Sequence, residues 1–120
     1  MKENVLKKKS FDFALRIIKL YKYLREEKKE IIMSKQLMRS GTSIGAMIRE
    51  SEFAESKNDF IHKISIAQKE INESLYWLEL LNDSEYLNVQ QFESINNDAV
   101  ELIKLITSSI KTAKKSIINH

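Results

Sequence analysis

Residues 39–50 read RSGTSIGAMIRE, and this stretch decides the fold because it must be helical in spite of its composition. Each glycine weakens an isolated helix by about 1 kcal/mol relative to alanine, so tertiary packing has to offset the loss. Gly41 and Gly45, the only glycines of the chain, are four residues apart and share one helix face. A face without side chains lets another helix approach closely. We therefore expect Gly41 and Gly45 to be helix-packing contacts.

The composition of the whole chain favours long helices in a single domain, residues 1–120. It has no proline and only two glycines, whereas a sheet protein needs turn residues. It has no cysteine, which excludes disulfides and thiolate metal sites. The amino terminus lacks the apolar core of a signal peptide, and no apolar run approaches the ~20 residues of a membrane span. We expect a cytoplasmic protein with no membrane association.

Apolar spacing and capping signals divide the chain into a basic arm and four helices. Ser10, Ser34, Ser56 and Asn88 are suitable N-caps, and Asn82-Asp83-Ser84 is a turn signal. The expected elements are an arm at residues 1–9 and helices at about 11–28, 35–55, 57–82 and 89–118. Long helices with short links predict an all-α fold, an antiparallel up-and-down four-helix bundle.

The helix expected at 11–28 is apolar around most of its circumference. A helix of a monomeric bundle needs only about three apolar positions in seven, and this one has far more. It should therefore be covered on one side by its own bundle and on another by a second molecule. We expect a homo-oligomer, and closed cyclic symmetry is the general solution for such surfaces.

Charge is distributed unevenly along the chain. Residues 1–30 contain 10 Lys and Arg against 5 Asp and Glu, a balance of +5, whereas residues 58–88 contain 2 against 6, a balance of −4. The two stretches either complement each other, within or between subunits, or the basic one binds a polyanion. The candidate nucleic-acid-binding residues are Lys7, Lys8, Lys9, Arg16, Lys19 and Lys22. Arg25, Lys28 and Lys29 extend this basic stripe.

Catalysis and metal binding find little support in the sequence. Asp59-x-x-His62 has the spacing of a carboxylate–histidine pair, but no second copy supplies the rest of a di-iron site. With one internal histidine and no cysteine, no nucleophilic triad can be assembled. We expect no catalytic residue, no metal and no cofactor, hence a non-enzymatic protein.

Two further features leave alternatives open. Glu50 either joins a polar network or inter-subunit pair with Arg39 or Arg49, or it is simply solvated. Tyr76 and Trp77 look like a recognition pair, but the dense apolar spacing around them favours packing.

Four segments carry a resemblance to a known family: residues 39–50, then SKNDFI at 56–61, SIA at 65–67 and ESLYWLELL at 73–81. In order and spacing they resemble the four-helix-bundle proteins encoded in intervening sequences of bacterial 23S ribosomal RNA genes. That family is related to the accessory variability-determinant protein of diversity-generating retroelements. Met47 stands where the family often has Asn, so any polar contact of that Asn is absent or replaced in this chain.

The resemblance implies an assembly and a set of partners. It suggests a homopentamer whose basic surfaces contact RNA or DNA and a reverse transcriptase. Two functions are compatible with the sequence: a nucleic-acid-binding accessory module, or a protein-protein interaction scaffold in which the basic and acidic helices dock partners.

Overall fold

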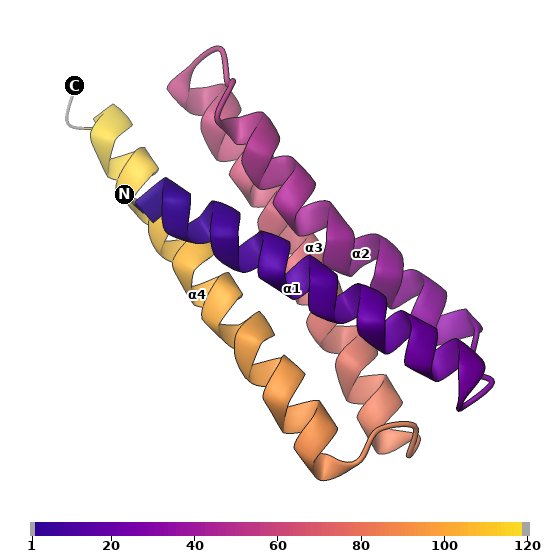
Figure 1. Ribbon diagram of the computed structural model, residues 1–120. Coiled ribbons are helices and arrows are strands. Elements are labelled where there is room, and N and C mark those ends of the chain that lie inside the picture. The colour runs from indigo at the N-terminus through magenta and orange to yellow at the C-terminus, as the bar shows by residue number, and fades with distance from the viewer. Residues whose placement is uncertain (1, 119–120) are drawn as a thin grey trace.

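Four helices joined by short turns make up the computed structural model (Figure 1), which describes the backbone of residues 2–118 and the side chains of residues 5–118. The predicted all-α fold class is confirmed, since no strand occurs within these residues. The bounds are α1 (Lys2–Glu26), α2 (Ile32–Ser51), α3 (Lys57–Asp83) and α4 (Val89–Ile118).

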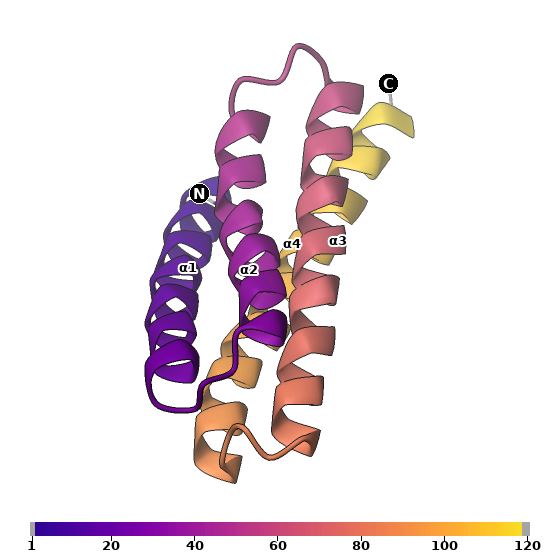
Figure 2. The same cartoon turned by 90° about the vertical axis from the view of Figure 1, so that its right-hand side faces the viewer.

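Each helix packs against the next one in the chain, and α1 also touches α4 in the smallest of the four interfaces. The α1–α2 and α3–α4 turns lie at one end of the molecule and the α2–α3 turn lies at the other (Figure 2). The result is an elongated body of 53 × 22 × 21 Å. None of the helices in its described part is long and apolar enough to cross a membrane.

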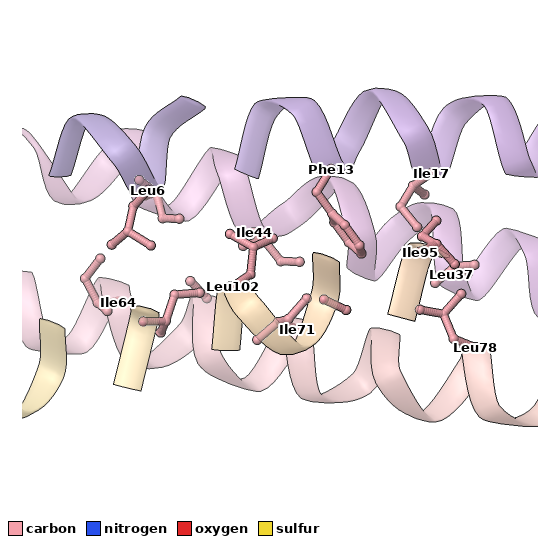
Figure 3. Packing of buried hydrophobic residues seen from close by; sticks show 14 of the residues in the cluster. Leu6, Phe13, Ile17, Leu37, Ile44, Ile64, Ile71, Leu78, Ile95 and Leu102 are labelled. Atoms are coloured by element: carbon pink, nitrogen blue, oxygen red, sulfur yellow. The ribbon is translucent and has the colours of Figure 1, made fainter. Parts of the chain in front are cut away.

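The core runs along the axis between the helices (Figure 3). All four contribute residues that are at most 1% exposed, spaced three, four or seven apart on one face of each helix. Examples are Phe13 and Ile17 of α1, Ile44 of α2, Ile71 of α3 and Leu102 of α4. This apolar seam is continuous over the length of the bundle, so no helix can shift without exposing it.

The expected arm at residues 1–9 is instead the first part of α1. Leu6, seven residues before Phe13, is 1% exposed and continues the buried face of the helix. Ser10 is no N-cap: it is fully buried inside the helix, and its hydroxyl donates to the carbonyl of Lys7. A buried leucine outweighs the capping preference of Ser10. Met1 and the side chains of residues 2–4 lie outside the described part.

The start of α2 also differs from the expected one. Ser34 is buried in the first turn, and the cap is the Glu30 carboxylate, which accepts from the backbone N–H groups of Ile32, Met33 and Ser34 at 3.0, 3.0 and 2.7 Å. A carboxylate next to a helix N-terminus also interacts favourably with the macrodipole. Consequently α2 begins at Ile32 rather than residue 35, and it ends at Ser51 rather than residue 55.

The remaining helix ends follow ordinary capping rules. Ser56 accepts from the Asp59 N–H at 3.0 Å at the start of α3, and Asn88 and Gln91 cap each other at the start of α4. After α3 the Tyr86 N–H donates to the Leu81 carbonyl while Glu85 adopts a φ of 68°. This is a Schellman end with glutamate in the place that glycine usually takes.

Both glycines of α2 face α1. A Cβ placed on Gly41 would lie 2.8 Å from Ile17 Cγ1, too close for any real contact, and Ile17 is fully buried. A Cβ on Gly45 would lie 3.4 Å from Ser10 Oγ and 3.6 Å from the Ser10 carbonyl oxygen, which is ordinary van der Waals distance. The close approach of α1 and α2 therefore depends strictly on Gly41 and more loosely on Gly45.

We predict that Gly41→Ala is less stable than Gly45→Ala by about 1–3 kcal/mol. Both substitutions gain the same helix propensity, but only the one at Gly41 drives a methyl group into the stiff, buried Ile17. Urea unfolding followed by circular dichroism measures the difference. Gly45→Leu should destabilise the protein, because the larger side chain does not fit beside Ser10. Equal midpoints for the two alanine variants would contradict this account.

Candidate nucleic-acid interface

The structure divides the six candidate residues into a paired group and a free group. Lys7, Lys8 and Lys9 lie near Glu52, Asp12 and Glu101, with N–O distances of 3.5, 3.0 and 2.7 Å. The hydrogen bond to Glu101 raises the pKa of Lys9 above its ordinary value. These exposed pairs add little stability, but each carboxylate cancels local positive charge.

Arg16 joins α1 to α4 instead of lying free in an exposed stripe. Its Nη1 is 2.6 Å from Asp98 Oδ2 and 3.2 Å from the Ser94 carbonyl oxygen, and its Nη2 donates to Ser94 Oγ at 2.8 Å. A planar guanidinium that is engaged on both arms is held in one orientation. Arg16, one of the candidate residues, is therefore not a free cation.

The two candidate residues that remain free lie in the second half of α1, toward the α1–α2 turn. Lys19 and Lys22 are exposed and form no ion pair with any described residue. The same holds for the cations that follow them at the end of α1, in the turn and at the start of α2. We call the cluster at the end of the bundle the basic tip; it consists of Lys22, Arg25, Lys28, Lys29 and Lys35.

Most of the candidate residues predicted from the sequence lie in the first half of α1, whereas the unpaired cations near the α1–α2 turn begin at Lys19. The pairing of Lys9 with a carboxylate of α4, and of Lys7 with one of the α2–α3 turn, depends on the tertiary structure. Lys35 was not among the predicted residues because it belongs to another helix. The sequence feature that indicates this cluster is the series Lys22, Lys28, Lys29 and Lys35 on both sides of one short turn.

Buried hydrogen bonds hold the turn that carries the basic tip. The Glu30 N–H donates to the Leu24 carbonyl at 2.9 Å, and the Ser34 hydroxyl donates to the Glu30 carbonyl at 2.9 Å. Lys29 adopts a φ of 56°, a left-handed conformation that bulky residues seldom adopt. Glu30 itself is only 6% exposed. These hydrogen bonds hold the backbone that carries the cations of the basic tip in one conformation.

A hollow of about 440 Å³ opens beside the basic tip. Its lining consists of Tyr21, Lys22, Arg25, Glu26, Lys29 and Ile31. The guanidinium of Arg25 lies 5.3 Å from the centre of the Tyr21 ring and donates to the Tyr21 hydroxyl at 3.1 Å. Three cations against one carboxylate leave this hollow with a positive balance.

The outer face of α1 carries three partly exposed apolar side chains among exposed charged residues, which include Lys8, Asp12 and Lys19. Val5, Phe11 and Leu15 are 42%, 48% and 46% exposed, although they belong to a helix whose opposite face is fully buried. The Arg49 guanidinium lies 5.4 Å from the centre of the Phe11 ring and covers one side of it. This outer face lies next to the free cation Lys19.

The structure gives the contacts and the exposure of the other residues that the sequence singled out. Glu50 is exposed, and its Oε1 lies 3.3 Å from Lys63 Nζ, so its partner within the chain is Lys63. Met47 is partly buried against the core, and Trp77 packs there too, while Tyr76 is 55% exposed. His62 is exposed, and no group of three His, Cys, Asp or Glu suited to a metal ion occurs among the described residues.

A second polar network joins α2 to α3. Arg39 contacts Glu70 at 3.2 Å and also pairs with Glu73, which in turn accepts from Trp77 Nε1 at 2.9 Å. The hydrogen bond from Arg39, together with that from Trp77, lowers the pKa of Glu73 below its ordinary 4.5. The acidic α3 therefore complements α2, and the free cations of α1 have no share in it.

The sequence matches the model of the family described as 23S rRNA-intervening sequence protein over residues 2–108. A crystal structure of a protein with unknown function from the S23 ribosomal protein family of Bacteroides thetaiotaomicron VPI-5482 is 60% identical. The alignment covers 92% of this chain and 99% of that one, with a TM-score of 0.91. No curated protein matches.

We predict that the fluorescence of Trp77, the only tryptophan, titrates with a midpoint below pH 4.5. Because folding depresses the pKa of Glu73, its stabilising contribution is complete above pH 4.5 and is lost as the pH falls through the folded-state value. Arg39→Gln should raise the midpoint toward 4.5, and Glu79→Gln, at an exposed site, should leave it unchanged. Circular dichroism at each pH separates this titration from unfolding. Identical midpoints in the parent and Arg39→Gln would refute the coupling.

Proposed function

The chain belongs to the 23S rRNA-intervening sequence protein family, and on that premise we propose that it is a non-enzymatic, nucleic-acid-binding accessory protein. The observation that carries the proposal is the set of unpaired cations at the basic tip and at Lys19. Phosphate groups are the chemistry that such a set of lysines and arginines fits, and no element of the bundle resembles a base-reading helix. Binding by charge, with weak sequence preference, is the expected mode.

The proposal extends to assembly, with an antiparallel up-and-down bundle as the protomer of a cyclic homo-oligomer. Phe11 and Leu15, which lie one turn apart on α1 and are each about half exposed, support it, because exposed apolar surface marks interfaces. The resemblance to retroelement accessory proteins supplies the number five. A ring would repeat the basic tip in every subunit, so that weak phosphate contacts add up on one polyanion.

The resemblance also gives the cellular setting of the proposal. We place the protein in the cytoplasm, without metal or cofactor, beside RNA or DNA and, if it is a retroelement component, a reverse transcriptase. A reverse transcriptase gene next to its own gene would favour the retroelement role. A location within a ribosomal RNA gene would favour the intervening-sequence role.

One observation favours a second candidate function, a protein-protein interaction scaffold. Glu79, Asp83 and Glu85, at the end of α3 and after it, are exposed and form no ion pair with another described side chain. They lie at the same end of the bundle as the basic tip (Figure 2). A partner with a basic surface would fit them, and nucleic acid would not.

We predict that duplex DNA and structured RNA bind at low salt and that Lys19, Lys22 and Lys28 together contribute most of the affinity. All three are replaced by Gln in the test variant. The slope of log binding constant against log salt concentration should become less steep by about 0.9 for each phosphate of duplex DNA that the variant no longer neutralises. The matched control replaces Lys7, Lys8 and Lys9, which have carboxylate partners, and should cost much less. Gel-shift titration across salt concentrations measures both.

The scaffold function would lead if the parent protein formed no complex at low salt. Equal losses of affinity in the two triple variants would instead mean that the ion pairs of residues 7–9 do not withdraw those lysines from phosphate.

We also predict that Leu15→Glu converts the oligomer into a monomer of 14.1 kDa, because a charge in an apolar interface loses its hydration. Val89→Glu is the control, since Val89 is 64% exposed at the start of α4, away from the outer face of α1. Analytical ultracentrifugation measures the mass of each variant. A parent protein that is monomeric at micromolar concentration would end the assembly proposal.

A further inference from the structure

We propose that the hollow beside the basic tip holds one unpaired nucleotide of a single-stranded nucleic acid, an inference that rests on the proposed function and names its ligand. The hollow measures about 440 Å³, within the usual range of small-ligand sites of roughly 300–1,000 Å³. Lys22, Arg25 and Lys29 line it together with a single carboxylate, Glu26. Phosphate charge is therefore matched at its rim.

The base would stack on the Arg25–Tyr21 pair. The guanidinium lies over the Tyr21 ring at 5.3 Å and is tied to the Tyr21 hydroxyl, so one planar face is held in place while the side chain remains exposed. Arginine planes and aromatic rings are the surfaces on which proteins stack unpaired bases. Ile31, 59% exposed, adds an apolar wall to the same hollow.

These features distinguish an unpaired nucleotide from a duplex. A duplex covers both faces of each base with its neighbours and presents phosphates to a protein surface, for which lysines alone suffice. A fixed planar cation and an apolar wall inside a hollow serve no purpose in that contact. Both features suit an unpaired base, whose exposed face can stack on the guanidinium and contact the apolar wall.

An anionic membrane surface is the competing ligand class. Ile31 and Ile32 are 59% and 75% exposed beside the lysines of the turn, a combination that also suits lipid. Insertion into lipid would use the isoleucines and the charge but would leave the ordered Arg25–Tyr21 pair without a role. The nucleotide accounts for all three features, so it is the occupant we propose.

The test compares one labelled oligoadenylate with the same strand annealed to oligouridylate, by fluorescence anisotropy at low salt. Arg25→Lys keeps the charge and removes the planar face. It should weaken oligoadenylate binding about tenfold, within the range of one base-stacking contact, and change duplex binding less than about twofold. Ile31→Ser should likewise weaken the single strand alone. Tyr21→Phe keeps the ring but removes the hydroxyl that orients Arg25, so it should also weaken oligoadenylate binding, by less than Arg25→Lys. The control is Lys69→Gln, on the exposed face of α3, which should bind like the parent.

The outcomes separate this inference from the proposed function. If Arg25→Lys and Ile31→Ser, both with unchanged melting temperatures, bind oligoadenylate like the parent while the duplex still binds, the nucleotide site is refuted and the proposed function stands. If neither nucleic acid binds, both fail. If phosphatidylserine vesicles bind in an Ile31-dependent way and oligoadenylate does not, the tip is a membrane contact and the inference is overturned.

Discussion

The close approach of α1 and α2 at Gly41 is the constraint on which the rest of the structure depends. Ile17 fills the space where any side chain at position 41 would be, and one turn further along α2 the backbone of Ser10 comes within van der Waals reach of a Cβ at Gly45. The two helices can come this close only along a strip without side chains. That approach fixes the rotation of α1 about its own axis, because Ile17 must point at Gly41.

The rotation of α1 about its axis determines the direction in which its other side chains point. Arg16 and Lys9 are directed toward α4, where Asp98 and Glu101 receive them. Phe11 and Leu15 are directed away from the bundle and stay about half exposed. One packing interaction thus decides which cations are neutralised within the chain and which apolar side chains remain exposed.

The α1–α2 turn depends on the same geometry. Because α2 must return alongside α1 at short range, the connection is only five residues long, and Glu30 is buried within it as the cap of α2. The turn holds Lys28 and Lys29 beside Lys22 and Arg25, and Lys35 follows in α2. Although Glu26 and Glu27 are exposed among them, these cations leave this end of the bundle with a positive balance, which attracts anions.

By itself the sequence determined the fold class, the number of helices and the starts of α3 and α4, because apolar spacing and side-chain caps such as Ser56 and Asn88 are local signals. It also indicated that Gly41 and Gly45 mark a helix contact. Only the tertiary structure decided where α1 begins, since Leu6 is helical by virtue of the core that buries it, and which cations are free. Ion pairs such as Arg16 with Asp98 join residues 82 positions apart, and no local pattern encodes such a distance.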